Sequence, residues 1–202
     1  MLPLSPALLI AAANAFVGLD DSTEEAPDSR PLRAQFLREV RVTRANVATA
    51  AWHTAFVHHV GYWSHYDGAG MHSSWPLPPT NDPSLLAHFA RRKDVLVTLP
   101  APGDIFLLWS PRRRTFVRSG IVERIVETGY RRNLHFYYDC VTIEGDTDES
   151  MALSGGRTLR HLRTLSSQDG DRFIRWGDIP VKREEGGRRL LPDRTAKSRR
   201  AA

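Results

Sequence analysis

The chain has 202 residues, 41% of them hydrophobic and 25% charged, a balance typical of a globular protein rather than of a disordered or fibrous one. Its single cysteine, Cys140, excludes an internal disulfide framework and a zinc site built from cysteines alone. No uninterrupted apolar run of about 18 residues is present, so the sequence predicts no transmembrane segment.

The formal net charge of +5 comes from the C-terminal end. Residues 181–202 contain eight basic and three acidic side chains, whereas residues 1–180 contain 20 of each sign. We therefore expect one domain over residues 1–180 and a basic, disordered tail over residues 181–202. A tail of this kind could make weak contacts with nucleic acid or another anionic surface through its charge.

The first 18 residues allow two interpretations. They are apolar and contain Ala13-Asn14-Ala15, which fits a signal-peptidase site. They lack Lys and Arg, however, and Ser5 followed by Pro6 is a typical helix start. The apolar residues follow helical spacing: Leu8, Leu9, Ala12, Phe16 and Leu19. We favour a helix of the domain over a signal peptide, and a soluble cytoplasmic protein over a secreted one, while the compartment itself stays open.

Three more helices are expected in the first half of the chain. Pro31 opens a short one, residues 50–66 give the strongest helical pattern, and Asp82 with Pro83 begins the third. Their apolar faces consist of Leu32, Phe36, Leu37 and Val40, then Trp52, Ala55, Phe56, Val60 and Trp63, then Leu85, Leu86 and Phe89. The helix over residues 50–66 is expected in the core.

The pattern becomes strand-like after residue 100. Pro100–Asp104 reads as a turn that leads into a buried strand over Ile105–Trp109, and Arg112-Arg113-Arg114 reads as a hairpin loop. Further strands are expected at residues 115–127, 133–144, 158–165 and 172–176. Helices followed by an antiparallel sheet predict an α+β domain.

Several short motifs then resemble one enzyme family, the CHAP-type (NlpC/P60-like) peptidoglycan amidases and endopeptidases. Ala51–Val57 resembles the W-C-A-A-F-V segment that carries the nucleophile, and Pro102–Ile105 resembles the P-G-D-I/V turn. Arg118–Val122 stands where H-V-G-I-V carries the catalytic histidine, and Thr142–Thr147 resembles T-I-E-G-N-T. Phe173–Trp176 resembles the closing strand, so that the resemblance covers residues 8–177. It implies a papain-like fold with N-terminal helices packed on an antiparallel sheet.

The same resemblance shows that the catalytic set is replaced. The family's Cys-His-Glu-Asn positions correspond to His53, Arg118, Glu144 and Asp146, of which only the glutamate matches. Because an arginine stays protonated, Arg118 cannot accept a proton as the catalytic histidine does. His53 would need a base of its own to attack an acyl group. Cys140 falls on a predicted strand and is expected to be a small core residue, so it cannot replace the nucleophile.

Two interpretations of the altered site remain open. Trp52, His53 and Arg118, with Trp109 in the groove wall, could bind the carboxylate of a cell-wall peptide or a phosphate. Alternatively, Arg118 pairs with Glu144 or Asp146 and closes the former site. The first interpretation requires an open groove, and the second requires a buried salt bridge.

Metal and aromatic clusters are weaker signals. His53, His58, His59, His65 and His72 lie close in sequence, but no H-E-x-x-H pattern is present, so neither a metal nor another cofactor is expected. Trp63, Trp75 and Trp109 are expected in the core or the groove wall, with a sugar-stacking platform as the alternative.

The functional hypothesis is a catalytically degenerate CHAP-like domain that binds a cell-wall peptide or a protein partner. One alternative is an active amidase or endopeptidase that uses His53 or a metal in an atypical site. Another is a structural or interaction module of a phage particle or a secretion system.

Overall fold

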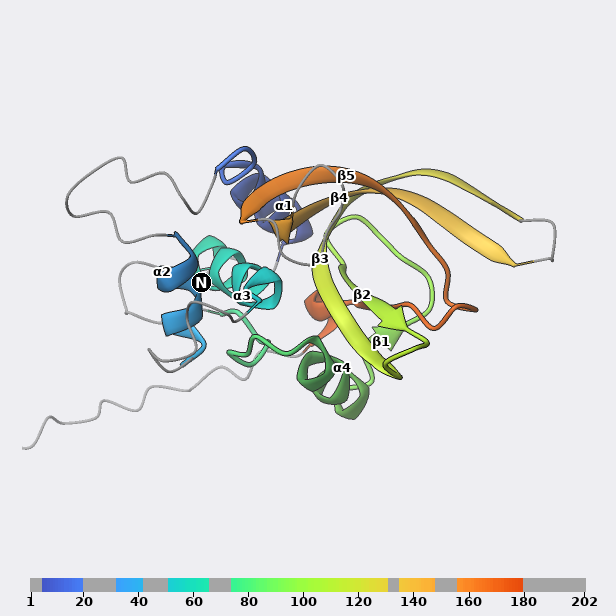
Figure 1. Cartoon of the computed structure of the whole chain (residues 1–202), viewed down its shortest axis with the longest axis horizontal. Helices are drawn as coiled ribbons and strands as arrows, with labels where there is room; N and C mark the ends of the chain where they lie inside the picture. The colour runs from blue at the N-terminus through green and yellow to red at the C-terminus, as the bar shows by residue number, and fades with distance from the viewer. Residues whose placement is uncertain are drawn as a thin grey trace, which may run out of the picture.

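A computed structural model describes residues 5–19, 32–41, 51–65, 74–130, 135–147 and 156–179. Over these residues the chain is an α+β domain in which helices pack against a six-stranded antiparallel sheet (Figure 1). The helices are α1 (Pro6–Asn14), α2 (Leu32–Glu39), α3 (His53–Ser64) and α4 (Pro83–Arg92). No helix within these ranges is long and apolar enough to cross a membrane.

The helix starts follow from the capping residues in the sequence. The Ser5 side chain accepts a hydrogen bond from the Leu8 N–H at the start of α1, and Asp82 accepts one from the Ser84 N–H, at 2.8 Å, at the start of α4. Each cap is followed by a proline in the first turn, where the missing N–H costs nothing. The four predicted helices are present, but α1 ends at Asn14, before the predicted position Leu19, and α3 is shorter than the predicted 50–66 at both ends.

The buried faces of these helices are narrower than the sequence pattern suggested. Four residues placed on them are at least one-third exposed: Leu8 (38%), Leu19 (40%), Trp63 (49%) and Leu85 (56%). The contact stripe of α1 instead runs through Leu9 and Ala13, which are fully buried. Helical spacing alone locates an apolar face but cannot tell its centre from its flank.

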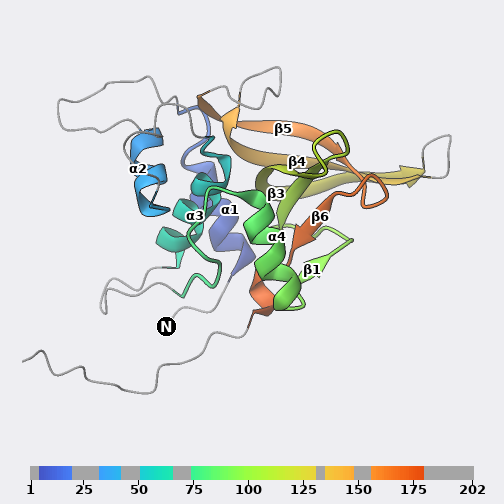
Figure 2. The same ribbon diagram turned by 60° about the horizontal axis from the view of Figure 1, so that its bottom comes forward.

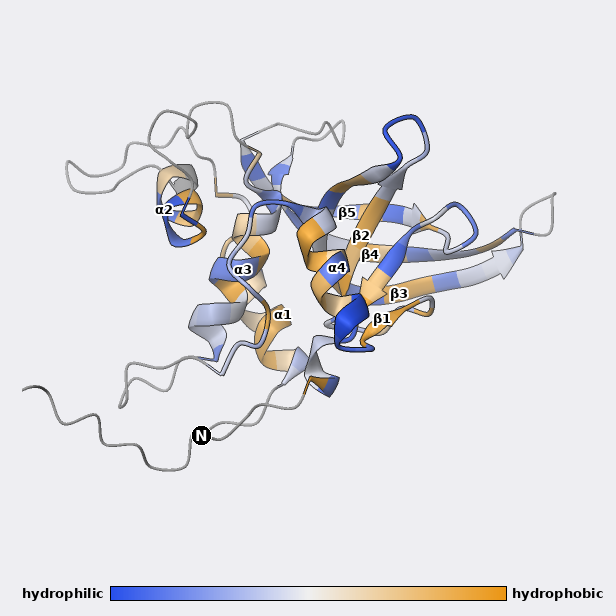
Figure 3. Ribbon diagram, turned by 90° about the horizontal axis from the view of Figure 1, so that it is seen from below, coloured by the Kyte–Doolittle hydropathy of each residue, from blue (hydrophilic) through white to orange (hydrophobic). Residues whose placement is uncertain are grey.

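The first half of α3 is buried on all sides, because other elements enclose it from several directions. It packs on strands β3 (Thr115–Tyr130) and β4 (Phe136–Thr147) and is covered by α1 and α2 (Figure 2). Every residue from His53 to Val57 is buried. Figure 3 shows hydrophobic segments where the helices meet the strands and hydrophilic ones in the loops. An aromatic cluster joins α2 to α3, with ring centroids 5.4 Å apart for Phe36 and Trp52 and 6.0 Å apart for Phe36 and Phe56.

The sheet has the order β1-β6-β2-β3-β4-β5. Its remaining strands are β1 (Leu96–Val97), β2 (Ile105–Ser110), β5 (Arg157–Leu165) and β6 (Arg172–Ile174). The far ends of β3 and β4 extend beyond the helices as a long two-stranded arm (Figure 1). The arm pairs Gly129 with Tyr137, and the register of the β3–β4 pairing shifts at two places closer to the helices, between Val122 and Arg124 and between Ile125 and Glu127.

Strand β4 lies at Phe136–Thr147 rather than at the predicted 133–144, and three other features of the sheet also differ from the prediction. Strand β1 was not expected, because two residues are too short for a periodic pattern. Strand β6 ends at Ile174, and Trp176–Asp178 form a short 3-10 helix rather than the end of the strand. Strand β3 continues to Tyr130, past the predicted end at residue 127. His72 and the predicted basic tail at 181–202 lie outside the described residues.

The close approach of α3 to the sheet depends on Gly145 in β4. A Cβ at this position would lie 2.5 Å from Trp52 Cζ3 and 2.8 Å from Phe56 Cβ. Real Cβ atoms do not come this close to other atoms, and neither buried ring has room to move.

We therefore predict that Gly145→Ala lowers the free energy of unfolding by about 1–3 kcal/mol, because overpacking pushes α3 away from β4. Urea unfolding followed by circular dichroism measures the change. Gly177→Ala is the matched control, since no heavy atom lies within 4 Å of the Cβ it would add. Equal midpoints for the two variants would contradict the close approach.

Candidate functional site

The structure brings the four positions of the replaced catalytic set together. His53 is the first residue of α3, Arg118 lies on β3, and Glu144 and Asp146 lie on β4. The Ser119 N–H donates to His53 Nδ1 over 3.4 Å, and the Trp52 N–H donates to Asp146 Oδ2 over 2.9 Å. The start of α3 is thereby fixed to both central strands of the sheet.

A buried ion network occupies the centre of this site. Arg118 and Glu144 are both fully buried, and Arg118 Nη1 donates to Glu144 Oε2 over 3.0 Å. Arg163 on β5 donates to both oxygens of the same carboxylate, from Nε over 2.7 Å and from Nη2 over 2.8 Å. The Thr142 hydroxyl adds a fourth hydrogen bond over 2.7 Å, and Arg118 Nη2 donates to the Asp146 carbonyl over 2.9 Å.

The charge of Glu144 is stabilised despite its burial. Desolvation alone would raise the pKa of this carboxyl, but the hydrogen bonds and the charge of Arg163, together with the charge of Arg118, hold the pKa below its usual value. Two guanidinium groups therefore hold one carboxylate in the interior, where an unpaired charge would be costly.

His53 is held as a neutral imidazole. Burial, reinforced by the positive charge of Arg118, lowers its pKa to about 3. Because the Ser119 N–H donates to Nδ1, the proton of the neutral ring lies on Nε2. The Thr54 hydroxyl bridges this ring and the Ser119 hydroxyl, at 2.9 Å from each. Ser119 itself is fully buried and is not available as a nucleophile.

The start of α3 is also unavailable for an anion. The carboxylate of Asp146 already accepts the Trp52 N–H, and the Asp146 backbone adopts φ 56° to place it there. Trp52 is fully buried. Trp109, which the sequence placed in the groove wall, packs instead against Phe116, with ring centroids 5.2 Å apart, and against Gly170. Arg118 thus lies in the buried salt bridge that a closed site requires.

Cys140 lies on the face of the sheet that points away from α3, which is also the face of Thr142 and Glu144. It belongs to a second apolar cluster with Phe106, Tyr138 and Phe173, and it is fully buried. Burial raises the pKa of its thiol to about 12, so it has no thiolate character at neutral pH. Among the described residues, the geometry therefore offers no reactive thiol beside the start of α3.

The histidines of α3 serve different contacts. His59 Nδ1 lies 2.8 Å from Glu39 Oε2, and His65 Nε2 accepts the Ser5 N–H over 3.2 Å. In the part of the chain that the structure describes, no three histidine, cysteine or acidic side chains are grouped as a metal site would need.

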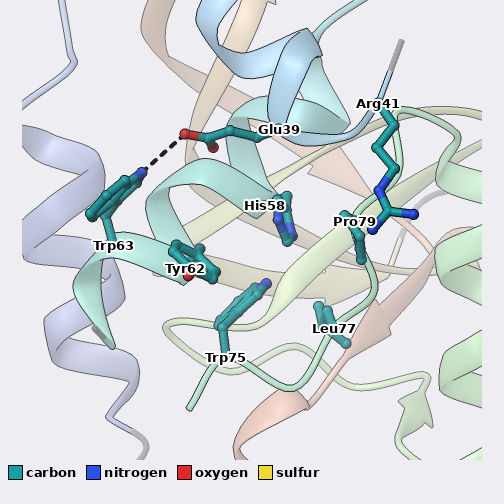
Figure 4. A pocket seen from close by; sticks show the side chains of 8 residues that line it. All are labelled: Glu39, Arg41, His58, Tyr62, Trp63, Trp75, Leu77 and Pro79. Atoms are coloured by element: carbon teal, nitrogen blue, oxygen red, sulfur yellow. Dashed lines mark hydrogen bonds between the residues drawn. The ribbon is translucent and has the colours of Figure 1, made fainter. Parts of the chain in front are cut away.

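A cavity of about 600 Å³ lies beside the second half of α3 (Figure 4). Its polar lining comes from Glu39, Arg41 and His58, and its aromatic lining from Tyr62, Trp63 and Trp75. The sequence singled out the two tryptophans, but not Glu39 or Arg41, which end a separate helix and carry no motif.

Residues missed by the sequence also complete the ion network. Thr142 stands two residues before Glu144 and therefore shares its face of β4, which the sequence could have shown. Arg163 could not be found, because its reach to Glu144 depends on the pairing of β4 with β5.

Comparison of the chain with protein-family models, with curated proteins and with solved structures finds no match.

We predict that Arg118→Met lowers the free energy of unfolding by about 3–5 kcal/mol, because it breaks a fully buried ion pair. Arg160→Met is the matched control. Arg160 also pairs with a glutamate, Glu123 at 2.9 Å, but its side chain is 46% exposed, and such a pair contributes about 0–1 kcal/mol. The urea unfolding midpoints of the two variants measure the difference. Similar decreases in stability would show that the buried pair contributes no more to stability than the exposed pair.

We also predict that stability falls as the pH falls from about 6.5 to about 5.5. The pKa of His53 is lowered to about 3 and that of His58 to about 4, so the unfolded chain binds more protons in this window. Each such histidine costs up to about 1.4 kcal/mol per pH unit.

His53→Asn should therefore flatten this slope relative to wild type when urea midpoints are measured across the window. Burial raises the pKa values of Asp104 and Asp171, which therefore act in the opposite direction, but both residues are present in wild type and in His53→Asn, so the comparison isolates His53. An unchanged slope in His53→Asn would mean that His53 is not held neutral.

Proposed function

We propose that this chain is a catalytically inactive domain of the CHAP (NlpC/P60) type, with a papain-like fold, that binds cell-wall peptidoglycan without cleaving it. The observation that carries the proposal is the fully buried Arg118–Glu144 pair, at 3.0 Å, in the position of the family's catalytic base. A pair that fills this position leaves no room for proton transfer.

The arrangement of elements supports the papain-like assignment. In the resemblance, the nucleophile begins a core helix and the base and its partners lie on the two adjacent strands. Here His53 begins α3, Arg118 lies on β3, and Glu144 and Asp146 lie on β4. The four positions lie in one region although they span residues 53 to 146, with Arg118 bonded to Glu144 and to the Asp146 carbonyl, and His53 bonded to the backbone of Ser119. Such a juxtaposition fits a hydrolase framework whose chemistry has been lost.

The loss of catalysis follows from three features of the site. His53 stands in the position of the thiol, is 3% exposed, and accepts a backbone N–H at Nδ1. Arg118 cannot remove a proton from any nucleophile. Without a general base the rate falls by about 10²–10⁴-fold, and the burial of Arg118 and Glu144 denies a substrate access to the site.

A binding role remains for the rest of the domain. The buried network holds α3 rigidly on the sheet, and α3 in turn supplies one wall of the cavity beside Tyr62 and Trp63. A rigid helix that presents polar and aromatic side chains around a cavity is typical of a ligand-binding surface. The wall polymer is proposed as the ligand because of the family resemblance.

The proposal predicts that the purified protein sediments with insoluble peptidoglycan sacculi but releases no free amino groups or soluble fragments from them. Sedimentation should persist at about 0.5 M salt, which screens attraction by the basic residues 181–202.

Clear turnover that is lost in His53→Ala would overturn the inactive assignment. Failure to sediment at either salt concentration would overturn the binding assignment. The two outcomes are independent, since hydrolysis and sedimentation are measured on separate samples.

A further inference from the structure

The cavity beside α3 is separate from the closed site. His58, Tyr62 and Trp63 lie one to three turns along the helix from His53, and the opposite walls come from the end of α2 and from residues 75–79 (Figure 4). None of the side chains that bind Glu144 takes part in its lining. Its chemistry therefore has to be considered on its own.

One wall of the cavity is held in place before any ligand arrives. The indole of Trp75 lies so close to Gly61 that a Cβ there would be 2.3 Å from its ring. Trp75 also packs on Trp176, with ring centroids 4.8 Å apart, and on His65, at 5.8 Å. The aromatic wall is thus preformed, which lowers the entropic cost of binding.

Trp63 supplies a second aromatic surface, and this one is open to solvent. Its side chain is 49% exposed, although tryptophan is usually mostly buried. Trp63 Nε1 donates to Glu39 Oε1 over 3.1 Å, so the orientation of the exposed ring is fixed (Figure 4). An exposed but oriented indole is suited to stacking on a flat ligand.

The polar groups of the cavity distinguish between ligand classes. His58 lines the cavity, and its buried Nδ1 has no hydrogen-bond partner among the described residues. Burial lowers the pKa of this imidazole to about 4, so it is neutral at pH 7 and offers one donor and one acceptor. A hydroxyl group, which both donates and accepts, satisfies such a ring better than a charged group does.

The charges of the cavity exclude other ligand classes. The Glu39 carboxylate already accepts a hydrogen bond from Trp63 at one oxygen and is bonded to His59 at the other, so it is not free to bind a cation. The Arg41 guanidinium faces the cavity and would repel a cation (Figure 4). A phosphate or other polyanion would be attracted by the Arg41 guanidinium but repelled by the nearby Glu39 carboxylate, so the charges of the lining do not favour it. A purely apolar ligand would leave the polar side chains that line the cavity, His58 and Arg41, without hydrogen-bond partners from the ligand.

We propose that this cavity binds a saccharide unit, whose apolar ring face stacks on Trp63 and whose hydroxyl groups bond to His58 and Arg41. The cavity of about 600 Å³ is within the range of small-ligand sites and large enough for more than one sugar ring. The inference rests on the proposed binding role and identifies the glycan part of a wall polymer as the portion recognised here.

The test uses the full chain with two neutral probes, chitotriose and cellotriose, which differ only in their acetamido groups. Saturation-transfer NMR detects contact, and a blue shift of tryptophan fluorescence reports stacking on Trp63. We expect binding of at least one probe, weakened about tenfold or more by Trp63→Ala. Tyr130→Ala removes an aromatic ring that is 70% exposed at the far end of β3 and should leave binding unchanged.

Two further variants test the polar and preformed parts of the site. His58→Phe keeps a ring of similar size but cannot bond a hydroxyl, and Gly61→Ala displaces Trp75. Both should weaken binding about tenfold, whereas His88→Ala on the exposed side of α4 should have no effect. Circular dichroism of each variant confirms that it is folded.

Failure of both trisaccharides to bind at tens of millimolar would overturn the proposal, as would binding that Trp63→Ala and His58→Phe leave unchanged. Choline or inorganic phosphate displacing the sugar from this cavity would also overturn it. If sacculi still sediment with the protein while the trisaccharides do not bind, the saccharide site fails and the proposed wall-binding function stands.

Discussion

The structure depends most on one buried carboxylate, Glu144, and on the two guanidinium groups that hold it. A carboxylate in the interior is tolerated only when partners replace the water it has lost, and here Arg118, Arg163 and Thr142 supply four hydrogen bonds. These side chains come from β3, β4 and β5, so the network fixes three neighbouring strands relative to one another. Removing one partner would leave the buried carboxylate with fewer hydrogen bonds and weaker compensation of its charge.

The same network determines what the start of α3 can do. Arg118 Nη2 holds the Asp146 carbonyl, and the Asp146 carboxylate in turn accepts the Trp52 N–H, so the helix start is bound to β4 through a continuous chain of contacts. Gly145 permits the helix to approach the strand closely. Rigidity gained in this way removes access to His53, but it gives the other half of α3 a fixed position beside the cavity. A buried, fixed start of α3 and a preformed cavity wall at its other end are consequences of the same packing.

The sequence predicted local features, such as helix starts, better than features that depend on strand register or on which side of a helix other elements cover. Capping by Ser5 and Asp82 located two helices, and the motifs around His53, Arg118 and Glu144 identified residues that do meet in space. Arg163 was missed because its role depends on how β5 pairs with β4. Trp63 was placed in the core because its spacing matches that of buried neighbours, whereas its exposure is decided by where α2 ends. The cavity joins three separate segments, which no local pattern could indicate.

The central claim is that Arg118 is enclosed in the interior by its ion pair with Glu144. Reaction of the native protein with phenylglyoxal, mapped by peptide mass spectrometry over time, tests it directly, because this reagent modifies only arginines that solvent reaches. The account predicts that Arg118, which is fully buried, stays unmodified after Arg160, whose side chain is 46% exposed, has reacted. Modification of Arg118 at a rate similar to that of Arg160 would contradict it and would indicate an open site.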